Sequence, residues 1–452
     1  MTNENENGES GPSPFVVSGV ECIDLAKSKL PISTGVGFLD HMIDQLNSHA
    51  QIGVAVSVAA MSSMNGVTTN GNSSEHTVET VNRYADMDQS VLLPLCGATI
   101  GKGLRRLLEK VPVGAQSRFL CPLDEALTEC RLENLGPAVS GNTDGQGKLD
   151  SFTLAPYGIF PRGKGRSKIG WMKTEYVEGF MRRLAQEAGL KLSLNKIRGD
   201  NGHHIVESTF KALSRALRNL IDGTNTNVYD STGFNTHWGL DSQSEKDSLA
   251  LSRLAKVERK TKETGIFVEV QFDGGKEGVH INTGIPPLDK LFVVLAEEAK
   301  VSLRMDCSGD VWIDDHHTSE DVAIALGQVL TKAFGTKAGL NRMWCANGTA
   351  GDAVVEVVMD LSNRPHMEHN LFLDDEEYVD GDLTVEMLVH VLESLVVNAR
   401  MTVHVVQHQQ GKTVLESATA TFVAFGRALR VCAAVDPRRA GKTASSKGTL
   451  SV

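Results

Sequence analysis

Internal repetition constrains the fold of this chain more than any other feature of its sequence. Three short motifs occur twice, in the same order in both halves. The matching segments are 33–40 with 282–289, 75–79 with 316–320, and 208–218 with 420–430. This order indicates a tandem duplication of a unit of about 200 residues. At 452 residues, the chain is also too long for a single hydrophobic core.

Composition between the motifs predicts the domain boundaries. The stretch that separates the copies is rich in Asn, Ser, Asp and Thr and has no sustained apolar period, which is typical of a linker. The first copy is the longer one. Its extra residues near 62–72 and 140–168 are rich in Gly and Ser, so we expect surface loops there. The expected segments are a disordered N-terminus over 1–13, a first copy over 14–223, a linker over 224–249 and a second copy over 250–452.

Apolar periodicity predicts the secondary structure. Residues 208–221 and 321–334 carry apolar side chains at i, i+3, i+4 and i+7, which predicts amphipathic helices. Residues 264–272, 352–361 and 401–408 alternate or are β-branched, which predicts strands. Strands followed by helices, repeated along the chain, indicate an α+β fold with helices packed on sheets.

Net charge and cysteine use narrow the classes of protein. A net charge of −11 argues against general binding to nucleic acid or to an anionic membrane, and no apolar run is long enough to span a bilayer. An anionic substrate would therefore need a local cluster of Lys and Arg. The seven cysteines are scattered and never form CxxC, and the N-terminus resembles neither a signal peptide nor a transit peptide. We expect a cytoplasmic protein, and an organelle stays open.

Two HHxxE motifs stand at the start of predicted helices. They are His203-His204-x-x-Glu207 and His316-His317-x-x-Glu320. Residues three and four apart share a helix face, so each Glu can join either His. The two adjacent histidines diverge by about 100° around the helix, which suits two metal ions better than one. Imidazole and carboxylate without thiolate suit Mn, Fe, Co or Zn. A single motif is as well explained by surface histidines, but two at helix starts make coincidence a poor explanation.

Longer motifs carry a family resemblance. Residues 38–46 (FLDHMIDQL) and 313–330 (IDDHHTSEDVAIALGQVL) are similar to imidazoleglycerol-phosphate dehydratases, as are CPLDEAL, DLSNRP, GHHIVESTFKALSRALR and DPRRAGKTASSKG. The resemblance covers nearly the whole chain, twice over. It implies an α+β fold of two tandem dehydratase domains, each built of two α/β half-repeats with helices packed on sheets.

The resemblance also implies an activity and an assembly. The activity is elimination of water from imidazole glycerol phosphate to give imidazole acetol phosphate in histidine biosynthesis, with Mn²⁺ as Lewis acid and template. The family forms a shell of 24 identical subunits with active sites at subunit contacts, so 12 of these two-copy chains could form an equivalent homo-oligomer.

The eight metal ligands that the resemblance implies are divided equally between the copies. The first copy keeps His41, His203, His204 and Glu207, and the second keeps His316, His317, Glu320 and His390. At the other positions the first copy has Glu75, His76, Glu79 and Gly179, and the second has Lys290, Leu415, Glu416 and Thr419. Lys290 would repel a cation. These complementary losses predict one composite two-metal site per chain, between a first-copy face and a second-copy face, and one dead mirror site. Whether one chain or two chains supply the halves stays open.

The residues that bind the substrate phosphate are divided in a similar way. The resemblance implies Gln45 and Lys211 in the first copy and Arg342, Arg364, Ser445 and Lys447 in the second. Glu263, in the second copy, and Asp124, in the first, are candidates for proton transfer; a surface ion pair explains each equally well.

Two other functions compete with the dehydratase. One is a catalytically inactive metal-binding scaffold or regulatory paralogue, in which the substitutions are general decay. The other is an enzyme of changed specificity, acting through the long loop after Cys130, which also carries the basic run at 161–168. The first is disfavoured because no metal ligand of the family is missing from both copies.

Overall fold

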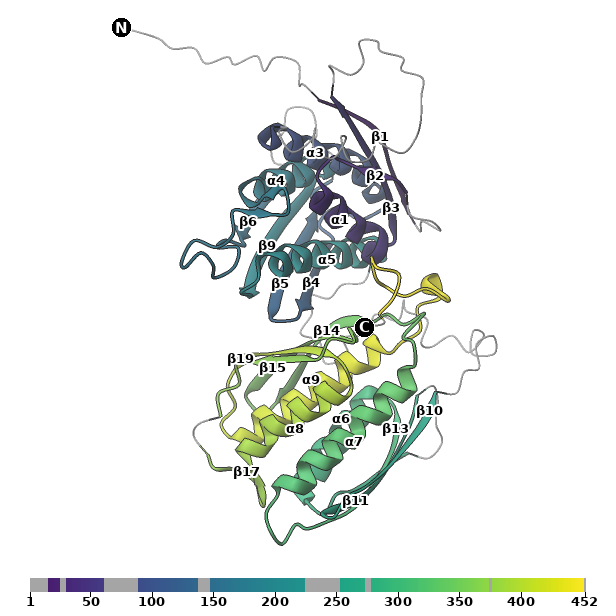
Figure 1. The fold of residues 1–452 in the computed structure, drawn as a ribbon, viewed down its shortest axis with the longest axis vertical. Helices are drawn as coiled ribbons and strands as arrows, with labels where there is room; N and C mark the ends of the chain where they lie inside the picture. The colour runs from purple at the N-terminus through teal and green to yellow at the C-terminus, as the bar shows by residue number, and fades with distance from the viewer. Residues whose placement is uncertain are drawn as a thin grey trace.

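The computed structural model of the chain describes residues 15–24, 30–60, 88–136, 147–223, 253–272, 278–373 and 376–450. Figure 1 shows two lobes, one for each copy, with the first copy above the second. The C-terminal tail of the second copy runs back to the first copy, where the Arg439 guanidinium donates to Ser48 O (2.9 Å) and His49 O (3.1 Å). Among the described residues, no helix is both long and apolar enough to cross a membrane.

Among its described residues, the first copy contains a three-stranded sheet, a four-stranded sheet, a two-stranded hairpin and four longer helices. Its elements are β1 (Phe15–Asp24), β2 (Ile32–Ser33), α1 (Gly37–Gln45), the π-helical turn η1 (Leu46–Ala50), β3 (Ile52–Ala60), α3 (Gln89–Leu108), β4 (Gln116–Leu123), β5 (Ala126–Asn134), β6 (Lys148–Thr153), the hairpin of β7 (Lys168–Ile169) and β8 (Met172–Lys173), η4 (Thr174–Tyr176), α4 (Val177–Ala188), β9 (Leu190–Arg198) and α5 (Gly202–Ile221).

The second copy follows the same order. Its elements are β10 (Leu254–Lys260), β11 (Thr264–Gln271), β12 (Val279–Asn282), α6 (Pro286–Ala299), β13 (Ser302–Gly309), α7 (His316–Phe334), β14 (Met343–Ala350), β15 (Ala353–Asp360), β16 (His366–His369), the hairpin of β17 (Tyr378–Asp380) and β18 (Leu383–Thr384), α8 (Val385–Asn398), β19 (Thr402–Gln409), α9 (Val414–Cys432) and the turn η6 (Pro437–Arg439).

One strand pattern recurs four times, which confirms the half-repeats. The sheets β4-β5-β9-β6, β10-β11-β13-β12 and β14-β15-β19-β16 each have three antiparallel strands and a fourth strand parallel to the third. The sheet β1-β3-β2 has the same antiparallel and parallel pairings in three strands. Each copy is therefore two α/β half-repeats.

Helices bury one face of each sheet. In the second copy, α6, α7, α8 and α9 lie between the two sheets, with α7 on β10 and β11 and α9 on β14 and β15 (Figure 1). Strict alternation of buried and half-buried residues along β11 fits a sheet with one covered face. Nearly every residue of β15 is buried, because its outer face meets the first copy.

The two copies join sheet to sheet. Leu120 and Leu127 of the first copy pack with Val358 and Val406 of the second in a separate apolar cluster. Beside it, the half-buried Arg118 guanidinium donates to both carboxylate oxygens of the buried Glu356, and this pair crosses between the copies. A buried charge without a partner would cost several kcal/mol, so this pair strongly favours one alignment of the two sheets.

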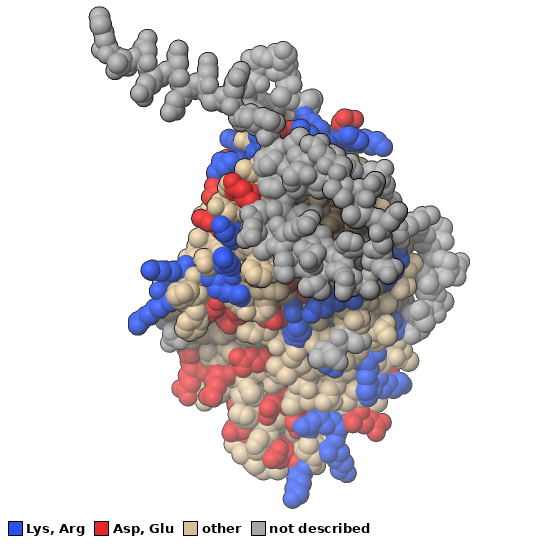
Figure 2. All heavy atoms as spheres, turned by 45° about the horizontal axis from the view of Figure 1, so that its top comes forward, with Lys and Arg blue, Asp and Glu red and all other residues tan. Residues whose placement is uncertain are grey.

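Surface charge is mixed rather than basic. Figure 2 shows Lys and Arg side chains interspersed with Asp and Glu on the visible face, among the described residues.

Several sequence expectations can be compared with this fold. The predicted helices coincide with α5 and α7, and the predicted strands with β11, β15 and β19. The expected loop over 140–168 is wrong in part, because residues 148–153 form β6 and pair in parallel with β9, as β16 pairs with β19. Every residue of β6 is exposed or half-buried, so the segment lacks the alternation of buried residues that predicts a strand. This is typical of a strand at the edge of a sheet. The expected N-terminal disorder over 1–13, the loop near 62–72 and the linker over 224–249 lie outside the described residues.

Candidate metal centre and anion cavity

The same local turn begins the first helix of each copy. Thr34 donates from its backbone N and its hydroxyl to Asp40 Oδ1 (2.8 and 2.6 Å), and Thr283 does the same to Asp289 Oδ1 (2.8 and 2.6 Å). In each case the carboxylate stands in the first turn of the helix and caps the preceding backbone. The residue that follows is His41 in the first copy, which belongs to a candidate metal-binding cluster.

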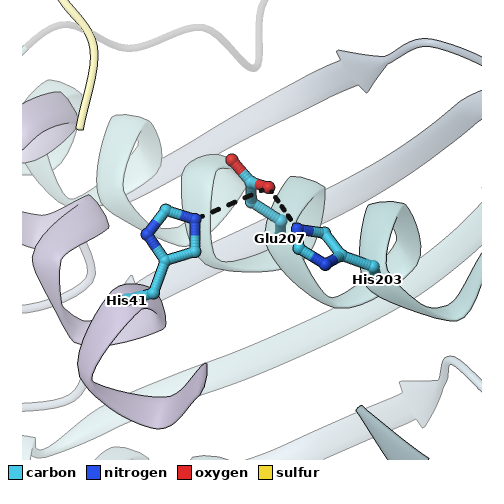
Figure 3. Close-up of side chains that lie close together, drawn as sticks. All are labelled: His41, His203 and Glu207. Carbon is cyan, nitrogen blue, oxygen red and sulfur yellow. Dashed lines mark hydrogen bonds and ion pairs between the residues drawn. The ribbon is translucent and has the colours of Figure 1, made fainter. Parts of the chain in front are cut away.

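Three side chains from two helices of the first copy form this cluster. His41 lies on α1, and His203 and Glu207 lie on α5 (Figure 3). Glu207 Oε2 lies 3.0 Å from His203 Nε2 and 3.8 Å from His41 Nε2. One ligand atom from each residue lies within 4.8 Å of the others. The Asn201 side chain caps α5 by accepting from His203 N (2.9 Å), which fixes the first turn.

Glu207 is held in its ionised form. Burial opposes its charge, but Lys211, with Nζ at 2.8 Å, and hydrogen bonds from His203 and His41 outweigh burial and hold the pKa of this carboxyl far below its usual range. An ionised carboxylate is the form that binds a cation.

A second cluster of the same composition lies in the second copy. His316 and Glu320 of α7 and His390 of α8 place one ligand atom each within 4.8 Å of the others. His390 Nε2 lies 3.4 Å from Glu320 Oε1, yet it is buried and makes no hydrogen bond. A buried nitrogen without a hydrogen bond, aimed at a carboxylate and a second imidazole, is consistent with a metal ligand.

His204 and His317, the second histidines of the two HHxxE motifs, do not belong to the clusters of their own copies. We call them the outer histidines. The rings of His203 and His204 are inclined by 81°, and those of His316 and His317 by 79°. The Nδ1 of each outer histidine contacts a carboxylate: Glu125 at 2.8 Å for His204, and Asp310 at 3.0 Å for His317.

The two candidates for proton transfer stand at equivalent places beside these outer histidines. Asp124 Oδ2 lies 3.7 Å from His204 Nε2, and Glu263 Oε1 lies 4.0 Å from His317 Nε2. Asp124 sits in the turn between β4 and β5, and Glu263 in the turn between β10 and β11. The fold thus gives both carboxylates the same relation to a metal-ligand candidate.

The start of α3 occupies the place in the first copy that α7 occupies in the second. Gln89 Oε1, at the first residue of α3, accepts from Lys173 N (2.9 Å), and Asp315 Oδ2, at the cap of α7, accepts from Thr384 N (2.7 Å). Both bonds tie the helix to the hairpin that precedes the neighbouring helix.

This correspondence corrects one pairing of the sequence analysis. Counted along α3 and α7 from these two hydrogen bonds, the counterparts of His316, His317 and Glu320 are Ser90, Val91 and Pro94. Residues 75–79, which match 316–320 in sequence, lie outside the described residues. Gly179 stands beside Pro94, whose Cγ would be 3.1 Å from a Cβ at that glycine. The two positions that hold Glu320 and His390 in the second copy therefore offer no metal ligand here.

In the second copy, the residues that replace His41 and His204 contact other residues of the same copy. Lys290 Nζ, at the position of His41, lies 3.1 Å from Asp380 Oδ2. Glu416, at the position of His204, accepts from Lys412 N (2.8 Å) and Asp352 N (3.2 Å). Glu416 thus binds the local backbone and Lys290 pairs with a surface carboxylate, so these two positions do not present a ligand set.

A cavity of about 550 Å³ lies where the first-copy cluster meets the second copy. Its walls come from both copies, including the C-terminal tail. The lining residues are His41, His49, Arg166, Asn201, His203, His204, Glu207, Lys211, Arg342, Ser362, Arg364, Ser445, Ser446, Lys447, Thr449 and Leu450.

Five of the six residues expected to bind phosphate line this cavity. They are Lys211, Arg342, Arg364, Ser445 and Lys447. Gln45 is buried behind the wall, where its Nε2 donates to His41 O (3.1 Å), and it is not among the lining residues. An anionic substrate of this acidic chain would need a local cluster of Lys and Arg. The cavity has such a cluster, and its residues come from both copies of one chain.

The fold also reveals a lining residue that sequence reasoning missed. His49 is fully buried, and neither of its ring nitrogens has a hydrogen-bond partner. Burial, together with Lys211 and Arg215, holds the pKa of His49 well below its usual range, so the ring is neutral. Its position eight residues after His41, about two helical turns on, is the signal that could have found it.

Within one chain the two metal clusters remain separate groups. The first-copy cluster shares the cavity with the phosphate-binding candidates, whereas His316, Glu320 and His390 are absent from its lining.

Comparisons with known proteins agree with the motifs. The family described as imidazoleglycerol-phosphate dehydratase matches residues 77–217 and 283–429. The chain is 40% identical over 211 residues to imidazoleglycerol-phosphate dehydratase 1, chloroplastic, of Arabidopsis thaliana, covering 46% of this chain and 76% of that protein. It is 38% identical over 198 residues to the dehydratase of Gloeobacter violaceus, covering 44% of this chain and 98% of that protein.

Two solved structures are also similar. The imidazoleglycerol-phosphate dehydratase of Staphylococcus aureus is 26% identical with a TM-score of 0.36, over 40% of this chain and 99% of its own. The enzyme of Pyrococcus furiosus, in complex with (S)-C348, is 28% identical with a TM-score of 0.37, over 43% of this chain and 99% of its own.

Proposed function

Because the chain belongs to the imidazoleglycerol-phosphate dehydratase family, it is a hydro-lyase of histidine biosynthesis, and we propose that it works through a two-metal site completed by a second chain. The reaction converts imidazole glycerol phosphate into imidazole acetol phosphate and water. The observation that carries the proposal is the shared cavity, in which a metal-ligand cluster of the first copy faces basic side chains of the second.

Both clusters have a donor set that fits Mn²⁺. Each offers two imidazoles and one carboxylate without thiolate, which suits Mn²⁺, Fe²⁺, Co²⁺ or Zn²⁺, and the family resemblance favours Mn²⁺. Each cluster has three ligands among the described residues, so a fourth must come from elsewhere.

We propose that the outer histidines supply the fourth ligands across a contact between chains. A carboxylate at Nδ1 orients His204 and His317 and leaves Nε2 for a cation. His41, His203 and Glu207 would be completed by His317 of a second chain. His316, Glu320 and His390 would be completed by His204. The number of working sites then equals the number of chains, because each chain lends its first-copy face to one site and its second-copy face to another, and the mirror positions form none.

The chain's own residues do the remaining work. When bound, the metal ions act as Lewis acids on the substrate's imidazole ring. Lys211 and the tail residues Ser445 and Lys447 bind the phosphate, and Arg364, oriented by Asp124 at 3.1 Å, faces the same cavity.

Glu263 is the better placed of the two proton-transfer candidates. Asp124 already holds Arg364, whereas the half-exposed carboxylate of Glu263 contacts only His317, at 4.0 Å, among the described ion pairs. We therefore propose that Glu263 removes the proton from the carbon next to the imidazole ring, and that Asp124 positions Arg364.

An assembly follows from this arrangement. If every working site needs two chains, a closed particle gives each first-copy face a partner, and 12 chains would reproduce the 24-domain shell that the family resemblance implies. The cytoplasmic location stays a prediction; the Arabidopsis relative is named chloroplastic.

Metal analysis together with a dehydratase assay tests the proposal. We expect two metal ions per chain in the parent, and loss of activity in His203→Ala and in His317→Ala. His76→Ala, at a histidine that the proposal assigns to neither metal cluster, serves as the control and should stay near normal. Four metal ions per chain, or an active His317→Ala variant, would contradict the proposal. Bound metal without dehydration would favour the scaffold.

A further inference from the structure

The basic side chains that line the cavity differ in whether a neighbouring carboxylate pairs with them. Arg166, Lys211, Arg342, Arg364 and Lys447 line it. Lys211 pairs with Glu207 at 2.8 Å, Arg342 donates to both oxygens of Asp360 at 2.7 and 2.8 Å, and Arg364 lies 3.1 Å from Asp124. Arg166 and Lys447 have no ion pair with any other described residue.

Paired cations contribute hydrogen bonds but little net field, because the neighbouring carboxylate cancels most of their charge. A phosphate monoester carries about −1.5 to −2 charges near neutral pH. Two unpaired cations therefore match it in number, and one of them, Lys447, already belongs to the expected phosphate set. The other, Arg166, comes from the basic run over 161–168 and was not in that set.

The backbone of Arg166 is held in place. Its N donates to Tyr157 O (2.8 Å), and its carbonyl accepts from the Thr174 hydroxyl (2.9 Å). Gly165 has a φ of +69°, and a Cβ there would come within 2.7 Å of Tyr157 N, so the turn requires glycine at this position.

The same turn is joined to the helix that carries the metal ligands. Gly158 forms a bridge with Asn201, the cap of α5, and Ile159 N donates to Asp200 O (3.2 Å). A Cβ at Gly158 would lie 2.8 Å from Asp200 O. Arg166 is therefore presented from a turn packed against the start of α5, on the first-copy side of the cavity.

We propose that Arg166 is a substrate-binding residue that, together with Lys447 of the second copy, neutralises the phosphate dianion of the substrate. The two cations come from different copies, so the bound phosphate links them. A guanidinium can also donate two parallel hydrogen bonds to phosphate oxygens, which an ammonium cannot. This inference rests on the proposed dehydratase function.

Steady-state kinetics of the full chain with imidazole glycerol phosphate test the assignment. Arg166→Ala should raise KM about tenfold and change kcat less than about twofold, as expected for loss of one charge-assisted hydrogen bond. Arg166→Lys should recover part of the affinity. Arg162→Ala is the matched control, because it removes the same charge from the same turn at a residue that does not line the cavity.

Two further ligands identify the group that Arg166 binds. Inorganic phosphate should inhibit the Arg166→Ala variant about tenfold more weakly than the parent. Imidazole glycerol, which lacks the phosphate, should bind both proteins equally. An unchanged KM, an equal effect of Arg162→Ala, or an equal loss with the phosphate-free ligand would each overturn the role of Arg166.

Failure of the proposed function gives a different result. A parent protein that does not dehydrate the substrate would refute the dehydratase assignment alone. Calorimetric titration of parent and Arg166→Ala with inorganic phosphate would still decide whether Arg166 binds the anion, since that measurement needs no turnover.

Discussion

Carboxylates that contact the Nδ1 atoms of the outer histidines fix the orientation of those rings. Glu125 Oε2 contacts His204 Nδ1 at 2.8 Å, while its other oxygen accepts from Asn201 N at 2.9 Å. One side chain thus links the ring to the cap of α5. Because the carboxylate determines which nitrogen keeps the proton, it favours Nε2 as the ligand atom.

Removal of this carboxylate should weaken metal binding without unfolding the protein. We expect Glu125→Gln to lower Mn²⁺ affinity by about 10- to 100-fold, because the ring loses its orientation and basicity. Calorimetric titration of metal-free protein measures this affinity. Glu133→Gln, on the same strand β5 but away from the cavity, is the control and should bind as the parent does. Equal affinities in all three proteins would show that Glu125 does not position His204.

His404 contributes a pH dependence to the contact between the copies. Its Nε2 donates to Asp124 O (2.8 Å), and the Arg198 guanidinium faces its Nδ1 at 3.4 Å. Burial, and then the charge of Arg198 and His366, lowers the pKa of His404 to about 3. The folded state therefore keeps this ring neutral, whereas the unfolded chain protonates it at about pH 6.5. Stability is fully present above about pH 6.5 and is lost as the pH falls toward 3.

Replacing His404 with a side chain that does not titrate should reduce the loss of stability at low pH. His404→Gln keeps an N–H donor for Asp124 O, so its free energy of unfolding should fall by about 2 kcal/mol less than that of the parent between pH 7 and pH 5. Denaturant unfolding at the two pH values measures the difference, with His280→Gln, at an exposed histidine, as the control. Parallel pH profiles for parent and His404→Gln would contradict this role.

At the scale of the element, close helix pairs position the metal clusters. A Cβ at Gly327 of α7 would lie 2.6 Å from Asn398 Cβ and 2.8 Å from Leu395 O of α8, so the two helices approach nearly backbone to backbone. Gly101 of α3 has the same relation to α4, at 2.5 Å from Leu184 O. In the second copy this approach brings His390 to the start of α7; in the first copy it brings Gly179 to Pro94.

Widening the α7–α8 pair should destabilise the fold and the metal cluster together. We expect Gly327→Ala to lower the free energy of unfolding by about 1–3 kcal/mol, because helix backbone must move to admit a methyl group. Denaturant unfolding measures the change. Gly265→Ala, where nothing lies within 4 Å of the added Cβ, is the control. A Gly327→Ala variant as stable as the control would show that the helices can separate at little cost.

At the scale of the whole molecule, the two copies contribute different kinds of residue to the cavity. One copy supplies a metal cluster to the cavity, and the other supplies the tail and Arg342, whose guanidinium is held by Asp360. The second metal cluster is part of a different surface, so the proposed site requires another chain.

Complementation between two inactive variants distinguishes a site between chains from a site within one. His203→Ala damages only the first-copy face, and His317→Ala only the second-copy face. If working sites form between chains, equal co-expression of the two variants should restore about a quarter of parental activity, because a quarter of random contacts join two intact faces. A site completed within each chain would stay inactive in the mixture. Purification through different tags on the two variants shows that mixed assemblies were assayed.

The duplication, the element types and the identity of most site residues can be predicted from the sequence. Short-range patterns determine them: the period of apolar residues sets a helix or a strand, and the repeated HHxxE motif places two imidazoles and a carboxylate at a helix start. The complementary loss of ligands is likewise visible in the order of the residues.

Only the tertiary structure decided which of these residues meet. It placed the cluster of His41, His203 and Glu207 against the second copy's basic residues. It also put Pro94 at the place in α3 that Glu320 holds in α7, where the repeat in the sequence had suggested Glu79. It also brought His49 and Arg166 into the cavity. These outcomes depend on how sheets and helices far apart in the chain pack and on the path of a turn or tail, which local periodicity does not encode.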